Sequence, residues 1–188
     1  GLGMVTPLGN DVTTTWENLL QGKSGANRIT NFDPTKFKTQ FACEVKDLDM
    51  SGLLDQKELR RYDRYIHYAL KSSEEAIKDA QICMDKEDPI RCGVIYGSGM
   101  GGVNNLDIQI GNFGAGDGTP RYSPFFIPMA ITNIAAGILA IRYGFKGVNF
   151  ATTSACASSS HAIASACYQI RMGLADIIIA GGSEAAVE

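Results

Sequence analysis

The sequence predicts an α/β fold in which helices cover a mainly parallel sheet. Residues 148–152 and 175–181 are apolar runs of strand length, and residues 157–172 between them have the length of a helix. An apolar strand, a helix and a second apolar strand in succession indicate a parallel unit, because a parallel sheet is buried on both of its faces. With 188 residues, the chain is long enough to build one sizeable core.

The other elements are expected from apolar spacing and from turn residues. Trp16 and Leu19 lie at helical spacing before Gly22, which indicates a first helix that ends at this glycine. Apolar positions recur at helical intervals from Lys57 to Met84, which indicates one long amphipathic helix. In chain order we expect helix 11–21, a loop with a short strand at 41–45, helix 57–84, strand 92–98, helix 104–110, a glycine-rich loop 111–120, an extended segment 123–128, helix 129–143, strand 148–152, helix 157–172 and strand 175–181.

The helix expected at 157–172 differs from an ordinary surface helix. The stretch from Ala151 to Ile170, ATTSACASSSHAIASACYQI, contains no carboxylate, lysine or arginine. A helix on the outside of a sheet normally presents one charged face to water. We therefore expect this helix to be buried on all sides at the centre of the fold, where its small side chains let neighbouring backbones approach closely.

Composition excludes several classes of function. The formal net charge of -3 provides no basic surface for nucleic acid, and no apolar run reaches the roughly 20 residues that span a membrane. The five cysteines form no CxxC pair and no Cys/His cluster, so we expect no metal site. Scattered cysteines without a secretory signal indicate the cytoplasm, and we expect most of them to be buried. They are Cys43, Cys83, Cys92, Cys156 and Cys167.

Cys156 is the candidate nucleophile. It lies where strand 148–152 meets the following helix, and the unpaired amides and dipole of a helix N-terminus stabilise a thiolate. The same amides are suited to bind the oxygen of an acylated cysteine. Ligands of parallel α/β sheets collect at this edge, beyond the carboxyl ends of the strands. The alternative is that Cys156 is simply a small buried residue, as we expect for Cys167 in the middle of the helix.

The sequence offers no clear base for this thiol. His161 lies five residues after Cys156, about 140° around the helix, and therefore points away from it. His67 lies among tyrosines of the long helix and is interpreted as a packing or surface residue. No GxSxG elbow surrounds the serines near Cys156, so capping and local pairing are their expected roles. These serines are Ser154, Ser158, Ser159 and Ser160.

The glycine-rich stretch GSGMGG at 97–102 is a weak phosphate-loop candidate. It lacks the lysine of a P-loop, and its spacing does not fit the dinucleotide fingerprint. We interpret its glycines as positions where the backbone passes close to a substrate tunnel. Met100 is then an adjustable wall for an acyl chain, with ordinary core packing as the alternative.

Several linked motifs resemble one family over essentially the whole chain. The sequence around Cys156, TTSACASSSHA, together with SPFFIP at 123–128 and ADIIIAGGSEA at 175–185, closely resembles the β-ketoacyl-acyl-carrier-protein synthases, and in particular the elongating synthase II of fatty acid synthesis. Three further motifs match this type in order and spacing: MVTPLGN, RRYDRYIHYAL and IYGSGMGG.

The resemblance implies a thiolase-like layered αβαβα fold, of which residues 1–188 are the amino-terminal ketoacyl-synthase domain. The chain begins at GLGMVTP and stops just after an apolar run, which also indicates a portion of a longer protein. In this family two histidines, a lysine and a phenylalanine of the second half complete the site. The family is homodimeric, and its substrates are carried on the phosphopantetheine of acyl carrier protein, so no separate cofactor is expected.

The resemblance also assigns residues. Cys156 matches the nucleophile that accepts the acyl group, and its own backbone N–H supplies one oxyanion donor. Met100 matches the gate of the acyl pocket, Ala155 matches its wall, and Phe126 matches a wall residue provided by the neighbouring subunit. The acyl-enzyme then condenses with malonyl-acyl-carrier protein, giving a β-ketoacyl product and CO2.

Three other functions remain open at this point. A ketosynthase of a polyketide or aryl-polyene pathway shares the cysteine and the fold, and CASSS resembles its CSSS run. A non-catalytic chain-length partner is disfavoured because such partners lack the cysteine. A degradative thiolase is disfavoured because SPFFIP and GSGMGG belong to the carrier-protein branch of the fold.

Overall fold

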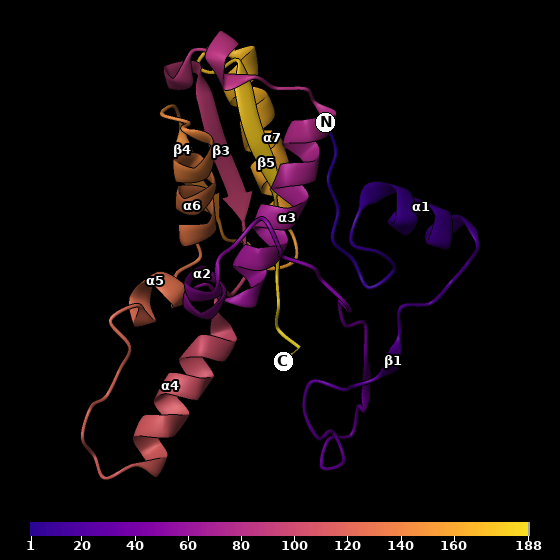
Figure 1. Cartoon of the computed structure of the whole chain (residues 1–188), viewed down its shortest axis with the longest axis vertical. Helices are drawn as coiled ribbons and strands as arrows, with labels where there is room; N and C mark the ends of the chain where they lie inside the picture. Colours follow the sequence, from indigo (N-terminus) through magenta and orange to yellow (C-terminus); the bar gives the residue numbers. More distant parts are fainter. Residues whose placement is uncertain (188) are drawn as a thin grey trace. The chain divides into compact units, whose positions relative to one another are not determined.

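The computed structural model describes residues 1–187 (Figure 1). The chain divides into two units. The first unit comprises residues 1–54, 71–82 and Val187, and the second comprises residues 55–70 and 83–186. The elements are α1 (Val12–Leu20), β1 (Asn27–Arg28), β2 (Phe41–Ala42), α2 (Gln56–Arg61), α3 (Arg64–Asp79), η1 (Met84–Lys86), η2 (Pro89–Arg91), β3 (Cys92–Gly97), α4 (Val103–Ala115), α5 (Phe126–Ala130), α6 (Ile134–Tyr143), β4 (Asn149–Thr152), α7 (Ser158–Arg171) and β5 (Ile177–Gly182).

The first unit contains α1 and a small antiparallel pair, β1 with β2. Asp11 is the N-cap of α1, where its carboxylate accepts a hydrogen bond of 2.7 Å from the Thr14 N–H. The predicted first helix is confirmed. The strand predicted at 41–45 is shorter, since β2 comprises only Phe41–Ala42. The side chain of the buried Glu44 accepts a hydrogen bond of 2.9 Å from the Thr30 N–H.

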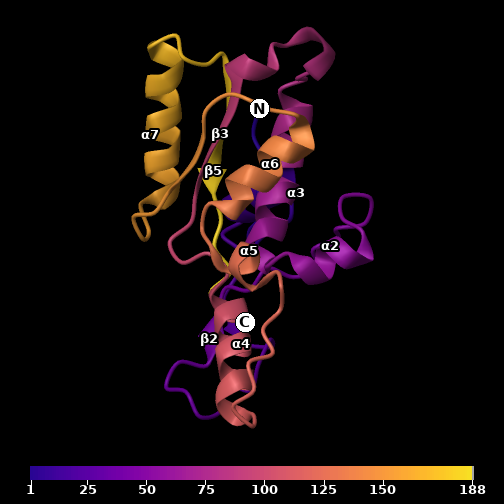
Figure 2. The same cartoon turned by 90° about the vertical axis from the view of Figure 1, so that its left-hand side faces the viewer.

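The second unit is built on a three-stranded parallel sheet in the order β4-β3-β5. Helix α7 connects β4 to β5 and therefore crosses the central strand β3 on one face, while α6 covers the other face (Figure 2). The α/β class, the parallel sheet and its three predicted strands are confirmed. The three strands begin and end at nearly the residues that the apolar runs indicate, and β3 is buried along its whole length.

The core between the sheet and α7 consists of small and branched residues. Ile95 of β3 and Ala162 of α7 have no exposed surface, and Ala166 completes the contact one turn further on. Burial of a side chain such as Ile95 contributes about 1.5–3 kcal/mol to stability. Alanine on α7 lets the helix lie close to the strand, as the sequence indicates.

The amino ends of β3 and β5 are joined by an arginine. Arg91 donates from Nε to Asp176 over 2.9 Å and forms a second, shorter hydrogen bond to the same carboxylate over 2.6 Å. It also donates to the Gly173 carbonyl over 2.8 Å. This two-pronged geometry fixes the pair in one orientation, and it holds the start of β5 at the level of β3.

The single long helix predicted at 57–84 is wrong, because the chain forms two helices there. Tyr62 is extended, with φ -97° and ψ 135°, and ends α2. The buried Asp63 then accepts a hydrogen bond of 3.4 Å from the Tyr65 N–H at the start of α3. Apolar spacing continues across this break, so periodicity alone does not reveal it. The helix also ends at Asp79 rather than near Met84.

Three predictions for residues 104–143 need correction. The helix predicted at 104–110 continues to Ala115, through glycines expected in a loop. The segment predicted as extended at 123–128 instead starts α5 at Phe126. Pro128 is compatible with this helix because the N–H groups of a first turn have no intrahelical partner. Finally, helix 129–143 is interrupted after Ala130 and resumes as α6.

The prediction that helix 157–172 is buried on all sides is wrong for this chain. One face of α7 packs on the sheet through Ser158, Ala162 and Ala166. The opposite face exposes Ile163 by 56% and Tyr168 by 63%. Within residues 1–187, only the sheet side of α7 is covered, so the absence of charge on the helix does not correspond to burial here.

Candidate functional site

Cys156 lies in the turn between β4 and α7, at the carboxyl edge of the parallel sheet. It precedes the first helical residue, Ser158, by two positions, and its side chain is exposed. Ala155 has a left-handed backbone with φ 50°, a conformation that is uncommon for residues other than glycine. The chain therefore turns sharply from strand to helix next to the thiol, in the place that the sequence predicts.

Ser158 holds this turn together from inside. Its hydroxyl accepts a hydrogen bond of 2.9 Å from the Ser154 N–H and donates one of 2.7 Å to the Ala155 carbonyl. Its own carbonyl accepts from the Thr152 hydroxyl over 2.8 Å. Local pairing, the role expected for the serines, is confirmed for Ser158, which is only 3% exposed.

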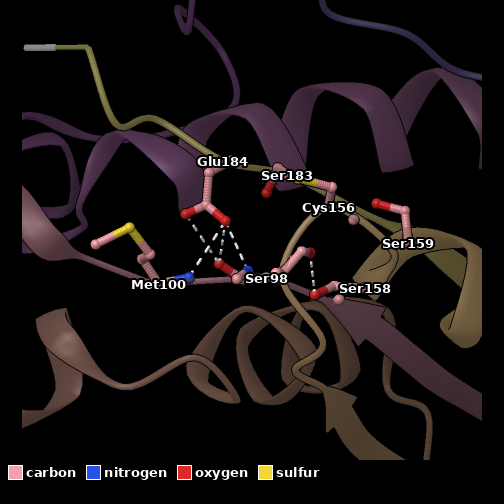
Figure 3. A pocket seen from close by; sticks show the side chains of 11 residues that line it. Ser98, Met100, Cys156, Ser158, Ser159, Ser183 and Glu184 are labelled. Carbon is pink, nitrogen blue, oxygen red and sulfur yellow. Dashed lines mark hydrogen bonds between the residues drawn. The ribbon is translucent and has the colours of Figure 1, made fainter.

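A cavity of about 430 Å³ lies beside Cys156 (Figure 3). Its walls come from the carboxyl ends of β3 and β5 and from the turn before α7, which bring Met100, Ala155 and Cys156 together. Met100 is 56% exposed and is therefore not a core residue. The full lining is Gly97, Ser98, Gly99, Met100, Ala155, Cys156, Ser158, Ser159, Gly182, Ser183 and Glu184.

Phe126, the fourth predicted site residue, does not line this cavity. It is the first residue of α5, where its ring stacks on Tyr122 with ring centroids 5.2 Å apart. The resemblance assigns Phe126 to the pocket of a neighbouring subunit. That role stays a prediction.

Sequence reasoning missed Glu184, which is the carboxylate at the cavity. Glu184 lies two residues after β5, and its Oε2 accepts hydrogen bonds of 2.6 Å from the Gly99 N–H and 3.2 Å from the Met100 N–H (Figure 3). The two partners are about 85 positions apart in the chain. The sequence contains one signal for this contact: both parallel strands end in glycines. The residues that follow these glycines meet at the same edge of the sheet.

The glycines of GSGMGG serve close backbone packing. A side chain at Gly97 would place its Cβ 2.6 Å from the backbone of Ser158, and one at Gly102 would strike the Met129 carbonyl. The glycines therefore let β3 and the following loop pass close to other protein backbone. Only Gly97 and Gly99 among the four also line the cavity beside Cys156, so the tunnel interpretation holds for part of the motif.

Neither histidine lines the cavity. His161 is exposed, and its Nδ1 shares a hydrogen bond of 2.6 Å with the Ser154 hydroxyl. His67 is half-buried in α3, where burial and the positive charge of Arg64 lower its pKa. This bond ties His161 to the turn that carries Cys156, and the orientation of His161 relative to the thiol stays a prediction.

The expectation that most cysteines are buried is wrong. Within the described residues only Cys92 is buried, and burial raises the pKa of its thiol. Cys167, expected to be structural, lies on the exposed face of α7. All five thiols are free of disulfides. The prediction assumed that α7 is covered on both sides, and the open face of this helix is the reason for the difference at Cys167.

Residues 1–187 contain no group of three or more His, Cys, Asp or Glu side chains placed to hold a metal ion. No helix among these residues combines the length and the apolar character needed to cross a bilayer.

An exposed thiol in a sharp strand–helix turn, with a cavity beside it, is typical of enzymes that hold a substrate covalently on cysteine. The whole chain, residues 1–188, matches the family described as Beta-ketoacyl synthase, N-terminal domain. The chain belongs to the β-ketoacyl synthase family.

Relatives of known name agree with this family. The chain is 41% identical over 187 residues to 3-oxoacyl-[acyl-carrier-protein] synthase 2 of Staphylococcus aureus, covering 100% of this chain and 46% of the relative. The chain thus spans about half the length of the curated relatives that it matches.

Solved structures confirm the fold. A β-ketoacyl synthase from Burkholderia phymatum matches with a TM-score of 0.84 and 28% identity, over 98% of this chain and 45% of that one. The ishigamide ketosynthase/chain length factor matches with a TM-score of 0.89 over 100% of this chain and 47% of that one. At 24% identity, this match supports the fold alone. The predicted thiolase-like α/β fold is confirmed.

Proposed function

We propose that this chain carries the acyl-accepting part of a β-ketoacyl-acyl-carrier-protein synthase of fatty acid elongation. The observation that supports the proposal best is the exposed Cys156 in its strand–helix turn, beside a cavity of about 430 Å³ that Met100 and Ala155 also line. Identity of 41% to the S. aureus synthase 2 favours fatty acid elongation over a polyketide pathway.

The proposed first step is transfer of an acyl group between two thiols. The Cys156 thiolate attacks the thioester carbonyl of acyl-acyl-carrier protein, and the new C–S bond forms as the bond to the phosphopantetheine sulfur breaks. The phosphopantetheine leaves as a thiolate and takes up a proton. The Ala157 and Ser158 amides already bond inside the turn, to the Ser154 and Ala155 carbonyls, so the proposed oxyanion donor is the N–H of Cys156.

The proposed second step joins the acyl group to a malonyl unit. Malonyl-acyl-carrier protein loses CO2, and the resulting carbanion attacks the acyl carbonyl and releases the Cys156 thiolate. The sequence has only two histidines, and neither lines the cavity, so we propose that the groups assisting decarboxylation come from residues outside this chain. We further propose acyl carrier protein as the partner, a homodimer as the assembly and the cytoplasm as the location.

The acylation step is tested with the natural protein that carries these residues. After incubation with acyl-acyl-carrier protein, mass spectrometry should find the acyl group on the peptide containing Cys156. Cys156→Ala should abolish this adduct while leaving the circular dichroism spectrum unchanged.

Cys167→Ala is the matched control, because Cys167 is also exposed and lies in the helix that follows Cys156. It should leave the adduct intact. An adduct that persists in Cys156→Ala, or that is shared equally by both cysteines, would refute the assignment. Stronger acylation by a polyketide carrier protein would instead favour the polyketide alternative.

A further inference from the structure

The loop that carries Met100 is held by a carboxylate from another strand. Glu184 Oε2 accepts hydrogen bonds from the Gly99 N–H at 2.6 Å and from the Met100 N–H at 3.2 Å. Each bond joins a backbone donor to an ionised acceptor and is therefore stronger than a neutral hydrogen bond. Figure 3 shows the carboxylate directed at this loop, with Met100 and Cys156 at the same cavity.

The end of β5 places Glu184 at this position. Gly182 of β5 is paired with Gly97 of β3, so the two parallel strands end side by side. Ser183 continues the contact, since its N–H donates to the Gly97 carbonyl over 3.1 Å. Its hydroxyl also donates to the Tyr65 carbonyl over 2.7 Å. Glu184 follows directly on this fixed residue.

Gly101 and Gly102 are fixed by other contacts, whereas Gly99 and Met100 depend on Glu184, to which the Ser98 hydroxyl also donates over 3.4 Å. The buried Ser98 hydroxyl accepts from the Gly101 N–H over 2.9 Å. The Gly102 N–H donates to the Ala130 carbonyl over 3.1 Å. In contrast, Glu184 is the one acceptor found for the Gly99 and Met100 amides within residues 1–187. Glycine neighbours give this stretch little conformational stiffness of its own.

We propose that Glu184 is a positioning residue, which fixes Met100 against the cavity beside Cys156 and so limits the length of the acyl chain. This proposal rests on the proposed function, since it assumes that Cys156 carries the acyl group. Loss of the carboxylate frees the two amides, Met100 moves away from the cavity, and longer chains fit.

Hydrogen exchange tests the contact without any activity. The amide protons of Gly99 and Met100 should exchange about tenfold faster or more in Glu184→Ala, because each loses a charge-assisted hydrogen bond. Glu184→Gln should keep most of the protection, since one amide oxygen accepts from both donors. Glu184→Asp retains the charge on a shorter side chain and should lose protection.

Glu17→Ala is the matched control. Glu17 is an exposed glutamate of α1, and its side chain makes no hydrogen bond or ion pair within the described residues. It should leave the exchange of both amides unchanged. Unchanged exchange in Glu184→Ala would overturn the proposal; if that variant is too unstable to study, unchanged exchange in Glu184→Asp would do so.

Acyl-chain preference tests the consequence. In Met100→Ala, acylation of Cys156 by palmitoyl relative to octanoyl carrier protein should rise about tenfold, the scale on which hydrophobic pockets discriminate chain length. Glu184→Ala should shift the ratio in the same direction by about threefold or more, and Glu184→Gln should restore the natural ratio. A merely structural role would lower both rates equally and leave the ratio unchanged.

The two proposals fail differently. If the natural protein forms no acyl adduct on Cys156, the proposed function is wrong, and amide exchange still decides whether Glu184 holds the loop. If the adduct forms and the ratio stays fixed in Glu184→Ala, the proposed function stands and the role of Glu184 in specificity is refuted.

Discussion

At the scale of single residues, His67 is a half-buried histidine that has no part in the proposed function. Burial lowers its pKa most, and the positive charge of Arg64 lowers it further. Its Nε2 has no hydrogen-bond partner within the described residues. A proton added to this ring therefore lies in an unfavourable environment, and the folded state favours the neutral imidazole.

This environment predicts a loss of stability in mild acid. The unfolded chain binds the His67 proton with a pKa near 6.5, and the folded state binds it with a lower pKa. Stability present above about pH 6.5 is therefore lost as the pH falls through the lower, folded pKa. Urea unfolding at pH 7.5 and pH 5.5 measures the loss, and His67→Gln should reduce it. An equal loss in the variant would contradict the prediction. The burial-raised pKa of Asp63 acts in both proteins and cancels.

The residues of the site were predictable to different degrees. Cys156 was predicted from local features, because an apolar strand, a turn and a charge-free helix follow one another in the sequence. Met100 and Ala155 were assigned by resemblance, and the structure brings both to the cavity beside the thiol. Glu184 was not predicted, since its partners Gly99 and Met100 lie on another strand and only the sheet register brings them together.

At the scale of elements, the contact between β3 and α7 depends on the absence of side chains. A Cβ at Gly97 would lie 2.6 Å from the Ser158 backbone, and one at Gly182 would strike the Ser159 hydroxyl and the Gly97 carbonyl. Backbone cannot move aside as a flexible side chain does. These glycines therefore set how closely the helix that follows Cys156 approaches the sheet.

Gly97→Ala should lower the free energy of unfolding by about 1–3 kcal/mol, the usual cost of forcing extra atoms into a packed contact. Gly111→Ala is the matched control, because Gly111 lies in α4 and its Cβ would meet nothing within 4 Å. It should raise stability by up to about 1 kcal/mol, since alanine favours a helix. Urea unfolding measures both changes. A Gly97→Ala protein as stable as the natural one would refute the close contact.

The elements themselves were predicted best where burial gives a strong pattern. Strands β3 and β5 appear as apolar runs. Helix α6 ends at Tyr143, as predicted, and Gly144 after it has a left-handed φ of 71°. The break between α2 and α3 was missed because Asp63 is a cap within a continuing apolar pattern. The extension of α4 through Gly111 was missed because glycine has a low helix propensity and usually marks a loop.

At the scale of the whole molecule, α7 has one covered and one open face. Ile163 and Tyr168 are exposed on a helix without carboxylate or lysine, and the chain spans about half the length of its curated relatives. The absence of charged residues predicted a helix covered on every side, but it does not indicate which segments would cover it. Burial on the sheet side was predictable, because strands of this chain provide it.

The proposed homodimer makes a prediction about Phe126. Sedimentation equilibrium of the natural protein should give twice the mass of one subunit. Phe126→Ala should change the ratio of palmitoyl to octanoyl transfer onto Cys156, although Phe126 does not line the cavity of its own subunit. An unaltered ratio of palmitoyl to octanoyl transfer in Phe126→Ala would contradict the assignment of Phe126 to a partner's pocket. A monomer that is fully active would contradict it as well.

Strand β5 is attached to its neighbour at both ends, by Asp176 before it and Glu184 after it. Each attachment reaches β3 or the residues next to it, so the number of residues between the two acids must match the rise of β3 over the same span. If one residue were removed from β5 or inserted into it, only one of the two acids could keep its hydrogen bonds, because the other would be displaced along the sheet. If Glu184 has the proposed role, the length of strand β5 also contributes to the choice of acyl chain.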